Sequence, residues 1–157
     1  GLPNKRNESW KYFDLISKSK KYIKNDISNS EIIVEDLEEK NIFYDYADNN
    51  LSIEDYFKPC NFFKSESVVD LNVACGNQIK ILDIKHTQNE PITIKIDHNG
   101  KNISLPRLII NIADNVKAKI NYVNSTTNGF LNLLVEFSTD TVPVQFTGTL
   151  EFFKLDL

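Results

Sequence analysis

Two histidines, His86 and His98, and two cysteines, Cys60 and Cys75, are the residues of this sequence with the most specific chemistry. Imidazole and thiolate groups bind zinc, so the two histidines and one cysteine could form a three-ligand site of the kind that metal-dependent enzymes use. The spacing does not favour that interpretation, because neither cysteine belongs to a C-x-x-C pair and no Cys/His tetrad has zinc-finger spacing. We expect the histidines to lie in surface turns and the cysteines to be buried, reduced thiols, the alternative being one disulfide.

Signatures of phosphate binding and nucleophilic catalysis are missing from the sequence. It contains no G-x-x-x-x-G-K-[ST], G-x-G-x-x-G, G-x-S-x-G or H-E-x-x-H pattern. Acidic residues gather at Glu35–Glu39 (EDLEE) and Ile53–Tyr56 (IEDY), where they resemble the solvated edges of helices. A glycosidase-type hydrolase would need two carboxylates converging in one cleft, which no pattern here indicates. We therefore expect a protein that is not an enzyme, with no catalytic, cofactor-binding or metal site.

Length and composition indicate one globular domain with at most a small appendage. The chain has 157 residues, of which 41% are hydrophobic and 11% aromatic, enough for a sizeable core. The formal charge is −4 with both signs interspersed, so we expect no nucleic-acid partner. No secretory segment and no run of 18 apolar residues is present, so we expect no membrane association and a cytoplasmic location.

Helical and extended patterns are mixed in the part of the sequence before Ser67. From Glu8 to Lys24 the apolar residues recur at helical spacing and include Trp10, the only tryptophan. Ser28–Glu31 (SNSE) matches a capping box, but the β-branched run that follows it suits a strand equally well. Asn41–Asn50 predicts a short strand followed by a polar turn, and Ser52–Pro59 predicts a short capped helix.

From Ser67 onward the pattern predicts strands. Eight short apolar runs follow one another: SVVDLNV, IKILDI, ITIKI, RLIINI, KAKINYV, LNLLVEFS, VPVQF and TLEFFKL. In KAKINYV (117–123) the alternation places Ala118, Ile120 and Tyr122 on one face. Turn residues separate the runs, and the Asn-Gly pairs at 99–100 and 128–129 are typical of tight hairpins. The rhythm fits either an antiparallel β-sandwich or a β-solenoid, and it does not decide between them.

Five blocks in order resemble the SufD family, a scaffold component of the SUF system that assembles iron–sulfur clusters. The opening, GLPNKRNESWKYFDL, matches the family signature at Gly1, Leu2, Pro3, Glu8, Trp10, Lys11 and Tyr12. The other blocks are IFYDYADNNLSIEDYF, FFKSESVVDLNVACGNQIKI, NEPITIKI and PRLIINIADNVKAKINYV. In that family, the fourth block would open a β-helix and the fifth would form one of its coils.

The resemblance implies a mainly β fold: a right-handed β-helix-like stack at residues 67–157, preceded by a small α/β part at 1–66 whose Trp10 anchors the first helix. The alternative is an antiparallel sandwich that binds carbohydrate or peptide. The implied function is a non-enzymatic scaffold that binds SufB-like and SufC-like proteins or associates with itself. Members of the family are longer, and the cysteine and histidine implicated in cluster assembly lie beyond this sequence. We therefore expect no cofactor in this chain, and an iron–sulfur cluster only in the assembled complex.

Overall fold

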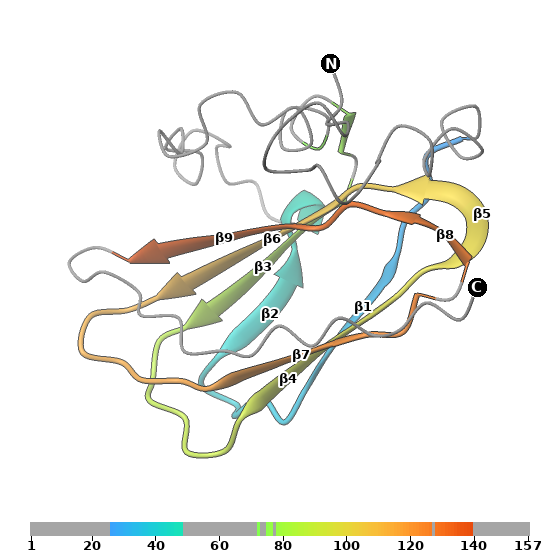
Figure 1. The fold of residues 1–157 in the computed structure, drawn as a ribbon. Coiled ribbons are helices and arrows are strands. Elements are labelled where there is room, and N and C mark those ends of the chain that lie inside the picture. The colour runs from blue at the N-terminus through green and yellow to red at the C-terminus, as the bar shows by residue number, and fades with distance from the viewer. Residues whose placement is uncertain (1–25, 49–71, 73–74, 77, 127, 140–157) are drawn as a thin grey trace, which may run out of the picture.

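The computed structural model describes residues 26–48, 72, 75–76, 78–126 and 128–139, and this part of the chain is mainly β (Figure 1). Its strands are β1 (Glu31–Glu35), β2 (Ile42–Asp45), β3 (Gln78–Ile84), β4 (Ile92–Asp97), β5 (Asn99–Ser104), β6 (Pro106–Ile112), β7 (Ile120–Asn124), β8 (Asn128–Leu131) and β9 (Leu134–Thr139). A 3-10 turn, η2 (Tyr46–Asp48), follows β2.

These strands form three sheets, with the orders β1-β4-β7, β2-β3-β6-β9 and β5-β8. The two larger sheets lie as separate layers, and β5 and β8 lie at the end where the layers come together (Figure 1). Strands three positions apart in the chain pair in parallel: β3 with β6, β6 with β9, β4 with β7 and β5 with β8. Only β1–β4 and β2–β3, among the described pairs, are antiparallel. The alternative of an antiparallel sandwich is therefore wrong for this part of the chain.

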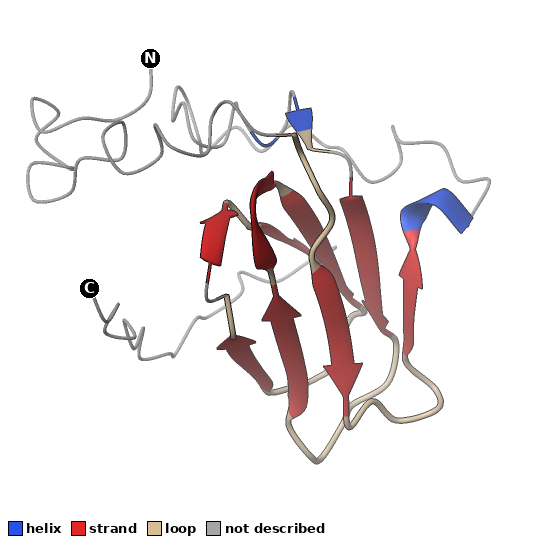
Figure 2. Ribbon diagram, turned by 90° about the vertical axis from the view of Figure 1, so that its right-hand side faces the viewer, coloured by secondary structure: helices blue, strands red, loops and turns tan. Residues whose placement is uncertain are grey.

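The parallel pairs have nearly constant spacing along the chain. Gln78 pairs with Pro106 and Ile92 pairs with Ile120, so the offset between partners is the same in both sheets. Arg107 pairs with Leu134, which makes the next offset shorter by a single position. From β4 onward, each strand belongs to a different sheet from the strand before it, so short turns carry the chain from one sheet to the next (Figure 2).

The core lies between the two larger sheets. Alternate residues of β4, Ile92, Ile94 and Ile96, are 0–1% exposed, while the residues between them are partly exposed. They pack in one cluster with Ile32 of β1, with Leu82 and Ile84 of β3, and with Leu108 and Ile110 of β6. Burial of each such side chain stabilises the fold by about 1.5–3 kcal/mol, so this cluster is the main source of cohesion between the layers.

The four-stranded sheet is also buried on its other face. In β3 and β6, Ile81 and Ile109 point away from the core cluster, because they alternate with its members. They are nevertheless only 0% and 1% exposed. On the outer face of the three-stranded sheet, by contrast, Ile33 is 41% and Val123 is 37% exposed. The centre of the four-stranded sheet is therefore buried on both faces, although Ile42 on its edge strand β2 is 46% exposed on the outer face.

In the first third, one local prediction is confirmed, one open alternative is decided in favour of a strand, and one prediction is wrong. The run after SNSE is strand β1, and the run at Ile42 is a short strand followed by a turn. The EDLEE segment is not the edge of a helix. It ends β1 and then turns, with Asp36 in the left-handed region at φ 60°. That conformation interrupts any helix, and the turn returns the chain to β2 in the opposite layer.

The Asn-Gly pairs do not form hairpins. Residues 99–100 begin β5 and residues 128–129 begin β8, and these strands pair in parallel. Gly129, at φ +108°, lies so close to the neighbouring strand that a Cβ would meet the Gly100 carbonyl oxygen at 2.5 Å. The glycine therefore serves the close approach of stacked strands, not a reverse turn.

The boundary expected for the strand at 117–123 differs from the one in the structure. Strand β7 begins at Ile120, so Lys117–Lys119 lie in the preceding turn, and Tyr122 is 48% exposed although its alternation partner Ile120 packs on the core. Strands β1 and β2, from the expected N-terminal part, pair directly with β4 and β3. The predicted helices at 8–24 and 52–59, and the runs at 142–146 and 149–155, lie outside the described residues, as does the run at 67–73 apart from Asn72.

Candidate functional site

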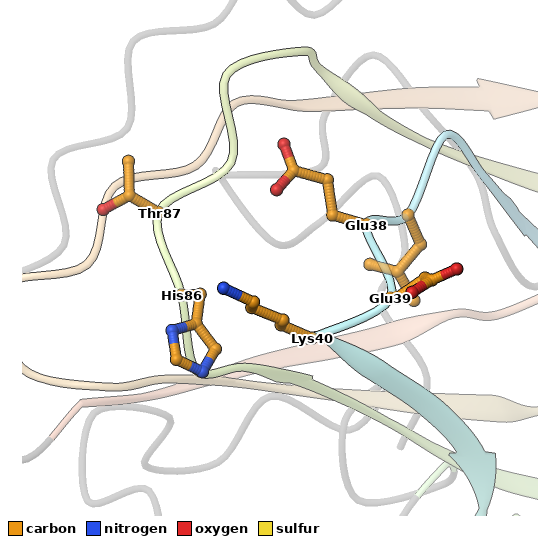
Figure 3. Close-up of a pocket in the computed structure, with 6 residues that line it drawn as sticks. Glu38, Glu39, Lys40, His86 and Thr87 are labelled. Carbon is orange, nitrogen blue, oxygen red and sulfur yellow. The ribbon is translucent and has the colours of Figure 1, made fainter.

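A shallow groove between two turns is the candidate site. The β1–β2 turn supplies Leu37, Glu38, Glu39 and Lys40, and the β3–β4 turn supplies His86 and Thr87 (Figure 3). In the close-up, the Lys40 side chain extends toward His86, whereas the Glu39 side chain points away from it. Glu38, Glu39, Lys40, His86 and Thr87 are all exposed. The groove therefore presents solvated charges and not a closed reaction chamber.

Two buried amides hold the walls of this groove together. Asn41, which is 4% exposed, accepts hydrogen bonds at Oδ1 from the backbone N–H groups of Lys85 (2.9 Å) and His86 (3.0 Å). Its Nδ2 donates to the His86 carbonyl oxygen (3.3 Å) and to Gln88 Oε1 (3.3 Å). One side chain of the β1–β2 turn thus binds the backbone of the β3–β4 turn through donor and acceptor together.

Gln88, also 4% exposed, completes this contact from the other turn. Its Oε1 accepts from the Glu38 N–H (3.1 Å), and its Nε2 donates to the carbonyl oxygens of Asp36 (2.8 Å) and Glu90 (2.9 Å). We call Asn41 and Gln88 the amide clamp. Its polar groups have partners within the protein, so the clamp fixes the geometry of two turns and leaves no polar atom for a ligand.

The two histidines do not converge on one site. His86 is exposed in the groove, as expected for a turn. His98 is 3% exposed, so the expectation of a surface position is wrong for it. Its Nε2 lies 3.0 Å from the Asn102 carbonyl oxygen, and Gly129 approaches the ring so closely that a Cβ there would meet Nε2 at 2.8 Å. The neighbouring strand β8 therefore covers the imidazole, which packs inside the fold.

The cysteines also differ from expectation. Cys75 is a free thiol, as predicted, but it is exposed and not buried. It directly precedes Gly76, whose N–H donates to the Asn72 carbonyl oxygen (2.7 Å), the spacing of an α-helical hydrogen bond, so the thiol lies at the end of a helical turn and not in the expected reverse turn. Cys60 lies outside the described residues. Among the residues that the structure describes, no group of three His, Cys, Asp or Glu side chains could hold a metal ion.

Each of the two large sheets carries an ion pair, and the two pairs differ in how exposed their side chains are. On the four-stranded sheet, Arg107 donates to both carboxylate oxygens of Glu136, at 2.9 and 2.6 Å, and their side chains are 12% and 19% exposed. On the other sheet, Lys95 donates to Glu35 at 2.7 Å, with side chains 43% and 42% exposed. Both pairs join neighbouring strands of a sheet, so they stabilise strand pairing.

Tyr122 is the described residue whose ionisation the fold changes clearly. Burial of its ring against β4 raises the pKa of the phenol above its ordinary value of 10.0. The residue lies on an outer strand and is 48% exposed. A phenol that keeps its proton more tightly is a poorer general base, so this change does not favour catalysis.

The amide clamp and a second buried polar cluster were not anticipated from the sequence. In that cluster, Gln78 Oε1 accepts from the Ser30 N–H (3.0 Å), Gln78 Nε2 donates to the Ser30 carbonyl oxygen (2.7 Å), and the Ser30 and Ser104 hydroxyls are 2.6 Å apart. Each of these residues lies at the end of a strand, next to a strand or in a turn, where polar residues are ordinary, so the sequence carries no signal of their burial.

No protein-family model, no curated protein and no solved structure matches the chain. Within the described residues, no helix combines the length and the hydropathy that a membrane span requires.

Proposed function

We propose that this protein is a non-enzymatic scaffold of the SufD type, built on a right-handed β-solenoid, which supports iron–sulfur cluster assembly through contacts with SufB-like and SufC-like proteins. Two observations support the proposal: the parallel strand topology of the described residues and the resemblance of the sequence to the SufD family. It assigns the chain to the cytoplasm and gives it no catalytic residue of its own. An iron–sulfur cluster would be held only in the assembled complex.

The observation that carries the proposal is the parallel pairing of strands three positions apart. In a solenoid, each coil adds one strand to each sheet and contacts only its neighbouring coils. Strands β3, β4 and β5 correspond to a first coil, β6, β7 and β8 to a second, and β9 to the start of a third. The nearly constant offsets between paired residues are then the lengths of successive coils.

In the proposed solenoid, β1 and β2 would cap the first coil. Strands β1 and β2 pair antiparallel with β4 and β3, so the first coil does not present open edges in those two sheets. Terminal caps of this kind limit edge-to-edge association of β proteins. The amide clamp joins the β1–β2 turn to the β3–β4 turn and fixes the cap on the first coil.

The resemblance blocks fall on these elements. NEPITIKI contains β4, and PRLIINIADNVKAKINYV runs from β6 into β7. These are the blocks that, by resemblance, would open the β-helix and form a coil. The assignment to the SUF system itself depends on the sequence resemblance, and the strand pairing supports only the scaffold part of it.

Co-purification tests the proposal. The full chain is expressed with an affinity tag together with the SufB-like and SufC-like proteins of the same cell, and the eluted proteins are identified by mass spectrometry. The proposal predicts stable recovery of both partners, and an untagged SufD-type protein of that cell, if added, should compete. Recovery of the chain alone, under conditions in which the SufB-like and SufC-like proteins still bind each other, would overturn it.

A further inference from the structure

Lys40 is a cation that has no carboxylate partner among the described residues, and it lies in the groove between the β1–β2 and β3–β4 turns (Figure 3). The ion pairs of the described residues involve other basic side chains, namely Lys80, Lys95 and Arg107. Lys40 follows two glutamates in the chain but pairs with neither. Glu39 points away from His86 in the close-up, and Oε1 of Glu38 accepts from the Asn89 N–H at 3.3 Å. The ammonium group therefore keeps its N–H donors for solvent or for a ligand.

Two further donors belong to the other wall of the groove. Lys40 extends toward His86, and the imidazole of His86 has no hydrogen-bond partner among the described residues. A protonated imidazole donates from both ring nitrogens. Thr87 Oγ1 already accepts from the Lys117 N–H (3.2 Å), so its hydroxyl hydrogen remains available for donation. The groove therefore offers an ammonium, an imidazole and a hydroxyl as donors, and they come from both turns.

The amide clamp fixes the backbone that carries these donors. Asn41 directly follows Lys40, and its Oδ1 accepts from the His86 N–H at 3.0 Å. Gln88 directly follows Thr87, and its Oε1 accepts from Asn41 Nδ2 at 3.3 Å. The two turns are thus held together without a ligand, and such preorganisation lowers the entropy that binding costs. The groove is open and has a volume of about 620 Å³, so a small hydrated ion fits it better than an apolar molecule, which requires enclosure.

We propose that this groove binds a small tetrahedral oxyanion of the class of sulfate and phosphate, through Lys40 Nζ, the His86 ring N–H and the Thr87 hydroxyl. Several equivalent oxygens allow such an anion to accept from donors on both walls, and hydrogen bonds from ammonium and imidazolium groups to an anion are stronger than neutral ones. The negative charge of Glu38 opposes the anion, so Glu38→Gln should bind it more tightly. The inference rests on the two described turns and does not depend on the assignment to the SUF system.

Titration of the full chain with sulfate tests the site, because sulfate keeps its charge in the range in which imidazole titrates. Sodium chloride keeps the ionic strength constant, and the backbone amide signals of His86 and Thr87 are followed by nuclear magnetic resonance. Lys40→Gln should weaken the saturable binding at least about fivefold. Lys119→Gln removes the same charge from an exposed lysine that does not line the groove, and it should leave the affinity unchanged. Shifts that do not saturate, or equal affinities of the two variants, would overturn the proposal.

The pH dependence of sulfate binding isolates the contribution of His86. Carboxyl and ammonium groups ordinarily titrate outside the range from about pH 6 to pH 8, and imidazole titrates within it. Sulfate should therefore bind at least about fivefold more tightly at the lower pH, and His86→Gln should remove that difference. The turns around the ring carry the charged residues Glu38, Glu39, Lys40, Lys85 and Lys117. A pH dependence that persists in His86→Gln would overturn the proposal. Acetate carries one charge where sulfate carries two, so equally tight binding of acetate would also overturn it.

Discussion

The two large sheets of this protein face different environments. In the sheet β2-β3-β6-β9, the central strand β6 is buried on both faces, with Ile110 at 1% exposure on the core face and Ile109 at 1% on the other, while Ile42 on the edge strand β2 is 46% exposed. In the sheet β1-β4-β7, Ile94 is 1% exposed on the core face, whereas Ile33 is 41% exposed on the outer face. The sequence reflects this difference, because RLIINI is nearly continuous in apolar residues while ITIKI alternates.

Ion pairs follow the same division. The Arg107–Glu136 pair lies on the four-stranded sheet and is largely shielded, and the Lys95–Glu35 pair lies on the open face and is nearly half exposed. A shielded, bidentate arginine–carboxylate pair interacts more strongly than an exposed lysine–carboxylate pair. The comparison teaches that the centre of the four-stranded sheet is shielded on both faces, while the outer face of the three-stranded sheet remains accessible.

The largest expected effect is at Ile109. Ile109→Ala should lower the free energy of unfolding by about 2–5 kcal/mol, because it leaves a cavity on a buried face. Ile33→Ala, the matched change on the open face, should cost less than about 1 kcal/mol. Urea denaturation of both variants gives the two values. Equal losses of unfolding free energy would show that Ile109 is no better buried in solution than Ile33.

The second-largest loss of stability is expected when the amide clamp is broken. Asn41→Ala removes two acceptor and two donor contacts between the β1–β2 turn and the β3–β4 turn, and it leaves buried N–H groups without partners. We expect a loss of about 2–3 kcal/mol. Glu39→Ala, in the same turn but exposed, is the control and should leave stability within about 0.5 kcal/mol of the parent. Thermal melting of the parent and the two variants measures both changes in stability. If Asn41→Ala melts at the same temperature as the parent, the amide clamp does not stabilise the fold.

The ion pairs should differ by a smaller amount. Double-mutant cycles on Arg107 and Glu136 should give a coupling energy of about 1–3 kcal/mol, and the cycle on Lys95 and Glu35 should give below about 1 kcal/mol. Added salt should weaken the second coupling more than the first, because screening acts on exposed charges. The reverse order of the two couplings would contradict the different shielding of the two sheets.

The smallest effect concerns Tyr122 at high pH. Its pKa is raised in the folded protein by burial, so the unfolded chain loses this proton first as the pH rises past about 10. Tyr122 therefore adds no pH dependence below that value and destabilises the fold above it. In Tyr122→Phe this part of the alkaline loss of stability should disappear. If the parent and the variant lose stability in parallel above about pH 10, the phenol is not shielded by β4.

Local strand formation was predictable, and strand pairing was not. The β-branched runs at β3, β4 and β6 identify those strands, since their composition and length are typical of buried strands. Strands β5 and β8 were missed because NGKNIS and NGFL contain few apolar residues and begin with a turn signal. Their pairing brings Gly129 over Gly100, two positions far apart in the chain, and no local pattern contains that information.

The candidate site shows the same limit. The turn position of His86 follows from its polar neighbours, whereas the burial of His98 follows from β8, a strand much further along the chain. The EDLEE segment has a helical composition, yet the short distance between β1 and β2 requires a turn there. Asn41 and Gln88 become partners only when the two turns meet, so their roles depend on tertiary structure.

The most direct test of the account is a measurement of which strands are neighbours in solution. In a nuclear Overhauser spectrum of the isotope-labelled protein, a solenoid predicts backbone contacts of Ile109 with both Ile81 of β3 and Glu136 of β9. It also predicts contacts between Ile94 and Tyr122. A spectrum in which β6 instead shows antiparallel contacts with β5 or β7, its neighbours along the chain, would contradict the solenoid and the scaffold function proposed from it.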